Sequence, residues 1–276
     1  MRPWDRPLGK DNANESNSPP HRRRFSRPDR SRTGAVARDD PHHLVRSGLC
    51  AHPNSLPFAS KTADPPGFQV ELGQALAREL GVSLKLDWII TQYQIRSADC
   101  DIMLDIIADR EAQGETRLRI SKPYYRTGVT LAVPSTSKLT SFKSLNEHTK
   151  VGVQVGSVAA MIISQRHVPT STFGFEVDSL EALANHEIDA AAVTPTAAAY
   201  FNLTHPGEEV RILDLDESEA NLNWNVAVGM VRPDDKLREA IDAALERLRA
   251  DGTIDRIYRR YGVALQLPRE LRANGQ

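Results

Sequence analysis

The stretch Leu248-Arg249-Ala250-Asp251-Gly252-Thr253-Ile254-Asp255-Arg256-Ile257-Tyr258 joins the end of one predicted helix to the start of another. Before it, apolar residues recur at helical spacing from Leu237 to Leu248, which predicts a long amphipathic helix. Gly252 predicts the end of that helix, because glycine is common just after the last helical residue. Beyond it, Ile254, Ile257 and Tyr258 repeat at helical spacing, so a second, shorter helix is expected.

Upstream of this helix pair, apolar runs alternate with amphipathic segments. Apolar residues repeat at helical spacing over 68–80 and stop at Gly81, which predicts a helix. Short apolar runs at 101–107, 151–155 and 188–193 predict buried strands. Strands that alternate with helices are typical of an α/β fold with parallel pairing, and this is the fold class that we predict.

Composition narrows the function classes. The 276 residues include 35 Lys and Arg against 36 Asp and Glu, for a formal net charge of -1. Such a balance gives no overall attraction to nucleic acid or to an anionic membrane, so no nucleic-acid partner is expected. Apolar residues make up 40% of the chain, as in ordinary globular proteins, and no run is long enough for a membrane-spanning helix. Two cysteines rule out a multi-cysteine zinc module.

Residues 1–42 differ from the rest, because they are basic, rich in Pro, Asn and Ser, and poor in apolar residues. Such a segment buries too little surface to order itself, so we expect a disordered basic tail. It is a solvated tail, translated sequence upstream of the true start, or a tail that binds nucleic acid. His42-His43 beside Asp39-Asp40 suggests a metal only weakly, and no metal site is predicted. No apolar segment of a secretory signal is visible here.

Three motifs in order resemble the extracellular solute-binding proteins of family 3. The helix pair at 248–258 is similar to L-x-x-D-G-x-x-x-x-I-Y. Residues 121–125, Ser-Lys-Pro-Tyr-Tyr, resemble S-x-P-Y-Y before the crossing into a second lobe. Residues 151–157 resemble the strand and turn that open that lobe. The resemblance covers residues 44–264.

This resemblance implies the bilobed type II periplasmic binding fold, in which two sheets with parallel cores and helices on both faces are joined by two crossing strands. Lobe one is then expected at 44–129 and 225–264, lobe two at 134–220, and a C-terminal tail at 265–276. A ligand is expected in the cleft, at the carboxyl ends of the strands, held by hinge closure.

Two contacts to an α-amino acid are altered relative to the family pattern. The arginine that binds the ligand carboxylate corresponds at best to Arg110, although its spacing from Tyr125 is longer than the family's. Thr194 stands where the family has an aspartate for the ligand ammonium. Since a threonine is neutral, the resemblance predicts a small polar ligand other than a standard α-amino acid.

Other polar residues have two interpretations each. Gly156 and Ser157 begin a predicted helix, where they can bind an anion or polar oxygen, or Ser157 can serve only as the helix cap. Asp105 ends a buried strand and must be paired or face a polar cleft. Its carboxylate can pair with a cation of the ligand or accept a hydrogen bond from a ligand hydroxyl. Alternatively, it binds an arginine or loop amides of the protein.

The loop after the first predicted strand, Cys50-Ala51-His52-Pro53-Asn54-Ser55-Leu56-Pro57-Phe58, is similar to C-A-x-P-N-x-L-P-F. That pattern stands near the start of the sequences in one branch of this fold, whose members are associated with quinoprotein (pyrroloquinoline quinone) alcohol dehydrogenases. The resemblance implies that Phe58 is a platform in the cleft, and that His52 and Asn54 are polar contacts there. A solvated loop histidine is the alternative for His52.

Cys50 and Cys100 could form a disulfide if the protein is exported. The distance along neighbouring parallel strands argues against the pair, because Cys50 is near the end of one strand and Cys100 precedes another. Both possibilities stay open on the sequence.

The resemblance therefore implies a periplasmic protein, monomeric and without cofactor or catalysis, that captures a solute and presents it to an ABC permease. Docking on a quinoprotein dehydrogenase is the first alternative. A dehydratase-like enzyme is the second, with Asp105 as its acidic group. No nucleophile elbow, zinc-protease or nucleotide-binding motif appears in the sequence.

Overall fold

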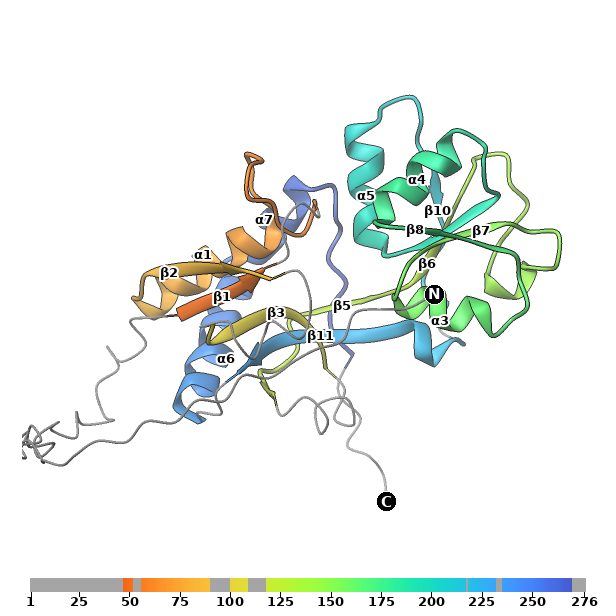
Figure 1. Cartoon of the computed structure of the whole chain (residues 1–276). Coiled ribbons are helices and arrows are strands. Elements are labelled where there is room, and N and C mark those ends of the chain that lie inside the picture. The colour runs from red at the N-terminus through yellow and green to blue at the C-terminus, as the bar shows by residue number, and fades with distance from the viewer. Residues whose placement is uncertain are drawn as a thin grey trace, which may run out of the picture. The chain divides into compact units, whose positions relative to one another are not determined.

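Two β-sheets, each with its own helices, organise the chain (Figure 1). The computed structural model describes residues 47–51, 56–89, 100–108, 118–216, 218–231 and 235–269, with the backbone alone for the first range. All of them belong to one compact unit that begins at Pro41. The predicted basic tail lies outside the described residues.

The first sheet has six strands in the order β2-β1-β3-β11-β4, with β5 also paired to β11. β1 pairs in parallel with β2 and β3, whereas β11 runs antiparallel to its neighbours. The strands are β1 (Ser47–Ala51), β2 (Leu84–Trp88), β3 (Ile102–Ile107), β4 (Arg119–Ile120), β5 (Tyr125–Gly128) and β11 (Asn223–Met230). The helices of this lobe are α1 (Phe68–Leu80), α6 (Asp235–Ala250) and α7 (Thr253–Arg260).

The second sheet has five strands in the order β10-β6-β9-β7-β8. β7 is parallel to β8 and β9, and β6 is antiparallel to β9 and β10. Its strands are β6 (Thr130–Val133), β7 (Val151–Gln154), β8 (Thr170–Phe173), β9 (Ala190–Val193) and β10 (Arg211–Ile212). Its helices are α3 (Val158–Ser164), α4 (Glu176–Ala184) and α5 (Pro195–Thr204), and two 3-10 turns are η3 (Phe142–Ser144) and η4 (Ala220–Leu222).

Aromatic side chains hold the helices of the first lobe together. The ring of Tyr258 on α7 stacks on that of Phe68 at the start of α1, with centroids 4.5 Å apart, and lies 5.2 Å from that of Tyr125 on β5. The Tyr261 hydroxyl accepts from the Gly67 amide at 2.8 Å and donates to Glu71. The helix pair that decides the fold therefore packs on the first helix and on the strand that leaves the lobe.

The mainly apolar run over 128–133 is divided between the two sheets. β5 ends at Gly128 in the first sheet and β6 begins at Thr130 in the second. Between them the Val129 amide donates to the Leu222 carbonyl at 2.8 Å, where the returning chain passes. A continuous apolar run in the sequence cannot reveal this change of partner.

Residues after 264 contact the first sheet. Gln266 forms an isolated bridge with Arg126, and the Asn225 side chain exchanges hydrogen bonds with the backbone of Arg269. The predicted C-terminal tail therefore begins with residues that pair with β5 and β11. Over the described ranges, no helix combines the length and the apolar character needed to cross a bilayer.

Gly128 provides a test of this crossing. A Cβ at this position would lie 2.0 Å from the Leu222 carbonyl oxygen, which belongs to backbone and cannot rotate away. We expect Gly128→Ala to destabilise the protein by about 1–3 kcal/mol, as overpacking does. Urea unfolding measures the loss. The matched control is Gly174→Ala, whose Cβ would meet only the Asp178 side chain at 3.5 Å. Equal stability of the two variants would contradict the crossing geometry.

Candidate functional site: an acidic pocket beside helices α4 and α5

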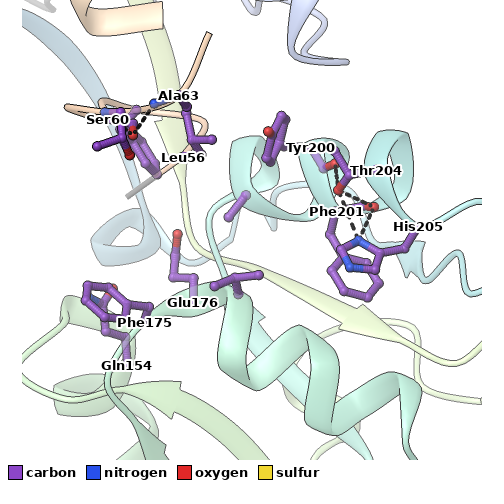
Figure 2. A pocket seen from close by; sticks show the side chains of 14 residues that line it. Leu56, Ser60, Ala63, Gln154, Phe175, Glu176, Tyr200, Phe201, Thr204 and His205 are labelled. Atoms are coloured by element: carbon purple, nitrogen blue, oxygen red, sulfur yellow. Dashed lines mark hydrogen bonds between the residues drawn. The ribbon is translucent and has the colours of Figure 1, made fainter. Parts of the chain in front are cut away.

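A pocket of about 490 Å³ lies at the start of α4 and along α5 (Figure 2). Both lobes contribute to its wall. The first lobe supplies the segment before α1, with Leu56, Phe58, Ser60, Thr62 and Ala63. The second lobe supplies Gln154, Phe175, Glu176, Val177, Ala197, Tyr200, Phe201, Thr204 and His205. A solute in this pocket would contact both lobes at once.

Glu176 is the carboxylate of the pocket. It is the first residue of α4, and Figure 2 shows its side chain pointing into the space between the segment of Leu56 and the helix of Tyr200. One carboxylate oxygen accepts from the Thr194 amide at 2.6 Å, and the other from the Thr194 hydroxyl at 2.8 Å. Among the described residues that line the pocket, none is a lysine or arginine.

Burial and these two hydrogen bonds shift the pKa of Glu176 in opposite directions. The residue keeps some exposed surface at the pocket wall, but its carboxylate is enclosed enough that loss of hydration raises its pKa. The amide and hydroxyl of Thr194 favour the ionised form and oppose part of that shift. A positively charged group in the pocket would therefore lower this pKa and be bound by the carboxylate.

Thr194 is held in a defined conformation by the start of α5. It is the N-cap of the helix, and its hydroxyl oxygen accepts from the Ala197 amide at 3.2 Å while its proton goes to Glu176. Pro195 at the first helical position needs no amide partner there. The sequence placed Thr194 in the site as a ligand contact. In the structure Thr194 is not part of the described pocket wall, and it acts on the pocket through Glu176, which it orients by two hydrogen bonds.

Aromatic side chains surround the remaining space. The imidazole of His205 stacks on the Phe201 ring, with centroids 4.2 Å apart, and its Nδ1 lies 3.0 Å from the Thr204 hydroxyl. Tyr200 lies between the pocket and the Tyr261 ring, 6.0 Å away. Phe58, predicted as a platform in the cleft, lines the pocket and packs against Phe68 with centroids 5.2 Å apart.

Other predicted site residues lie elsewhere. Gly156, with φ of 72°, and Ser157 precede α3, and the Ser157 hydroxyl accepts from the Ala160 amide at 3.1 Å, as in the helix-cap interpretation. Neither residue is part of the described pocket wall. His52, Asn54 and Arg110 lie outside the described residues, as do Pro53 and Ser55 of the loop that resembled the quinoprotein-associated branch.

Asp105 is satisfied within the protein. It occupies a bulge in β3 with φ of 56°, a left-handed conformation that aspartate tolerates better than most residues. Its carboxylate accepts from the Tyr124 hydroxyl at 2.5 Å and from the Gln69 amide at 2.6 Å. These partners are neither a ligand nor the arginine or loop amides considered on the sequence, and Asp105 is not in the described wall of the pocket.

Cys100 is buried and disulfide-bonded. It precedes β3, which begins at Ile102, and therefore lies outside the ladder in which Cys50 is opposite Met103. Cys50, the other cysteine of the sequence, is on β1, where the structure describes the backbone alone. Across the described ranges, no three His, Cys, Asp or Glu side chains are grouped so as to hold a metal ion.

Glu176 was missed on the sequence because the buried leucines of its helix, Leu180 and Leu183, begin one turn later. α4 begins at Glu176, since Asp178 accepts from the Phe175 amide at 3.0 Å and fixes the first turn. Asp178 three residues after Phe175 was therefore the available signal for the helix start. A glutamate three residues after the end of the parallel strand β8, on the expected cleft side of lobe two, would then have been a site candidate.

Residues 48–264 match the family described as bacterial extracellular solute-binding proteins, family 3. Because this match spans most of the sequence, the chain belongs to that family, and the predicted family and fold class are confirmed.

Known proteins similar to this chain bind amino acids. The L-arginine-binding protein of Pseudomonas aeruginosa is 26% identical over 232 residues, which cover 79% of this chain and 87% of that protein. The histidine-binding periplasmic protein of Salmonella typhimurium is 24% identical over 225 residues, covering 76% and 84%. A solved ancestral amino acid-binding protein, a precursor of cyclohexadienyl dehydratase, shares the fold with a TM-score of 0.64 at 21% identity, covering 81% of this chain and 99% of that one.

Asp105 predicts an unusual dependence of stability on pH. Burial raises its pKa in the folded state, so the stabilisation from its protonated form is complete at acid pH and is lost as the pH rises through the folded pKa. Asp105→Asn carries no charge at any pH and escapes this loss. We expect the variant to gain stability relative to wild type as the pH rises above the ordinary pKa of an aspartate, because a tenfold difference in proton affinity corresponds to about 1.4 kcal/mol.

Urea unfolding at several pH values measures this difference, and Asp251→Asn is the control of opposite sign. The pKa of Asp251 is lowered, chiefly by hydrogen bonding to Thr253. Its contribution is therefore present at neutral pH and lost on acidification, so this variant should lose stability relative to wild type as the pH rises. An Asp105→Asn variant that behaves like Asp251→Asn would contradict the assignment.

Proposed function

We propose that this protein is the periplasmic solute-binding component of an ABC transporter and that it captures a small solute with a positively charged nitrogen. The observation that carries the proposal is the Glu176 carboxylate, fixed by Thr194 and facing a pocket lined by both lobes. Opposite charges attract strongly where water is partly excluded, so this carboxylate favours an ammonium or guanidinium group over a neutral or anionic one.

The aromatic wall adds to this preference. Phe58, Phe175 and Tyr200 line the same pocket as Glu176. Aromatic faces attract cations, and they cover the apolar part of a ligand. Arginine and histidine, which give the similar proteins their names, both combine a basic nitrogen with such a part.

A standard α-amino acid is again a candidate ligand. The expectation against it depended on the neutral Thr194 at the position of the family aspartate. Glu176, hydrogen-bonded to Thr194, supplies a carboxylate at the pocket instead. The missing charge at position 194 is therefore no longer an argument against an ammonium-bearing ligand.

The proposal assigns no catalysis to the chain. Asp105 was the residue that supported a dehydratase-like alternative, and its carboxylate is engaged by Tyr124 and Gln69 rather than by the described pocket. An acid catalyst must reach the leaving group within hydrogen-bonding distance. Similarity to binding proteins agrees with this part of the proposal.

Export to the periplasm is supported by the bonded state of Cys100, because structural disulfides persist in oxidising compartments. We assign Cys50 as its partner, since the sequence has no third cysteine. Maleimide labelling of denatured, unreduced protein from the periplasm should find no thiol, and two after reduction. Two reactive thiols without reduction would contradict the pair.

Monomer is the expected state, and an ABC permease is the proposed partner.

Isothermal titration calorimetry tests the charge preference with ligands matched in shape. The panel contains arginine, histidine, lysine, agmatine and putrescine, with citrulline as the neutral counterpart of arginine. We expect at least one cationic member to bind, and arginine to bind more tightly than citrulline by about tenfold or more, because a charged hydrogen bond contributes roughly 1.5–3 kcal/mol. Equal affinity for the two, or no binding by any cation, would contradict the proposal.

Variants of Glu176 and Thr194 distinguish the effect of the carboxylate charge on binding from the effect of a disturbed fold. Glu176→Gln keeps the shape and removes the charge, and should weaken the best cationic ligand about 10- to 100-fold. Thr194→Val should weaken it too, because Glu176 loses one donor, whereas Thr194→Ser keeps both hydrogen bonds and should bind like wild type. Affinity should also fall as the pH is lowered through the pKa of Glu176, since a protonated carboxyl cannot pair with the cation.

A further inference from the structure

Helix α5 of the second lobe packs against the first lobe along one side. Its residues Thr196, Ala199, Tyr200 and Leu203 have the spacing of a single helix face. Ala199 and Tyr200 pack against the apolar core of the first lobe. The ring of Tyr200 lies 6.0 Å from that of Tyr261, the C-cap residue of α7. The position of α5 is therefore determined by the first lobe as well as by its own.

The start of the same helix is joined to β5 by a pair of hydroxyl groups. The hydroxyl oxygens of Tyr125 and Thr196 lie 2.9 Å apart, and both residues are buried. Thr196 is two residues from Thr194, which holds the Glu176 carboxylate. Neither Tyr125 nor Thr196 is part of the described wall of the acidic pocket. They can act on a ligand there only through the position of the helix.

Gly262 brings the end of α7 close to α5. Its φ of 75° is left-handed, and a helix end alone would explain a glycine with this conformation. Space is a second reason, since a Cβ here would lie 3.0 Å from the Ala199 carbonyl oxygen and 3.3 Å from the Leu203 Cβ. Gly81 ends α1 with a φ of 68°, and no described atom lies within 4 Å of the corresponding Cβ. The two glycines therefore differ in their contact with α5 rather than in backbone conformation.

The wall that the first lobe contributes to the acidic pocket is held by the same aromatic residues. Phe58 of that wall packs on Phe68, with ring centroids 5.2 Å apart. Tyr261 lies 6.1 Å from Phe68 and contacts Tyr200 of α5. The position of α5 against these rings therefore sets the distance across the pocket between Phe58 and Glu176.

We propose that Tyr125, Thr196 and Gly262 are positioning residues for the acidic pocket. By holding α5 against the first lobe, they fix how far the Glu176 carboxylate lies from the opposite wall. This inference rests on the proposed function of Glu176, which moves with α5 because the N-cap residue Thr194 donates both of its hydrogen bonds. Displacement of α5 would widen the pocket and admit water, which weakens the attraction between the carboxylate and a cation.

Replacement of Gly262 tests the contact, with Gly81 as the matched control. Isothermal titration calorimetry with arginine, histidine, lysine, agmatine and putrescine identifies the cation that the wild-type protein binds most tightly. We expect Gly262→Ala to weaken its binding about threefold and Gly262→Leu about tenfold or more, because the added side chain displaces α5. Gly81→Ala and Gly81→Leu carry the same backbone cost and should bind like wild type.

Small-angle X-ray scattering of the same proteins without ligand measures the arrangement of the lobes directly. Gly262→Leu should have a larger radius of gyration than the wild type, because its side chain separates α5 from the first lobe. Gly81→Leu should have the radius of gyration of the wild type. This measurement does not depend on any ligand.

Variants of the hydroxyl pair test the inference even if the Gly262 variants do not fold. Thr196→Val keeps the shape and loses the hydroxyl, and should weaken the same cation about three- to tenfold. Thr196→Ser keeps the hydroxyl and should bind like wild type. Tyr125→Phe should weaken binding as much as Thr196→Val, and the double variant no more than either alone, because both changes remove one interaction.

The inference would be overturned if Gly262→Leu matched Gly81→Leu in both affinity and radius of gyration, or if Thr196→Val bound like Thr196→Ser. The proposed function would survive that result, provided that the wild type binds a cation and Glu176→Gln does not. If no cation of the panel binds to the wild type, the proposed function fails. A larger radius of gyration for Gly262→Leu would then support the positioning contact, and an equal one would overturn it.

Discussion

A partly enclosed carboxylate must find hydrogen-bond donors, and Glu176 finds two on one residue, the amide and hydroxyl of Thr194. This contact joins the start of α4 to the start of α5 and fixes where negative charge faces the pocket. The cost of enclosing the charge is visible in the raised pKa of Glu176. Under the proposed function a bound cation would reduce that cost, so the carboxylate would favour a positively charged ligand.

Helix α5 connects this contact to the rest of the molecule. Its cap residue holds Glu176, one of its faces lines the acidic pocket, and Thr196 in its first turn accepts or donates a hydrogen bond with Tyr125 of the crossing strand β5. The Tyr125 ring in turn packs on Tyr258 of α7. The acidic pocket and the crossing strand therefore both depend on how this one helix is placed.

The fold could be predicted from the sequence because periodic apolar residues are local signals, as are the glycines at two helix ends, Gly81 after α1 and Gly252 between α6 and α7. The sequence could not predict where a strand changes sheets, because Val129 continues an apolar run and only the passing Leu222 carbonyl marks the crossing. Among site residues, Phe58 was predicted at the pocket and lines it. Glu176 and Thr194 are 18 residues apart. Their contact depends on tertiary structure, so the neutral residue at 194 could not reveal the carboxylate that it holds.

The central claim is that Glu176 gives the pocket its preference for positive charge. Native mass spectrometry of protein purified gently from the periplasm tests it without prior choice of a ligand. The account predicts a small molecule with a protonated nitrogen on the wild-type protein, and its loss from Glu176→Gln. A neutral or anionic molecule retained equally by both proteins would contradict the account.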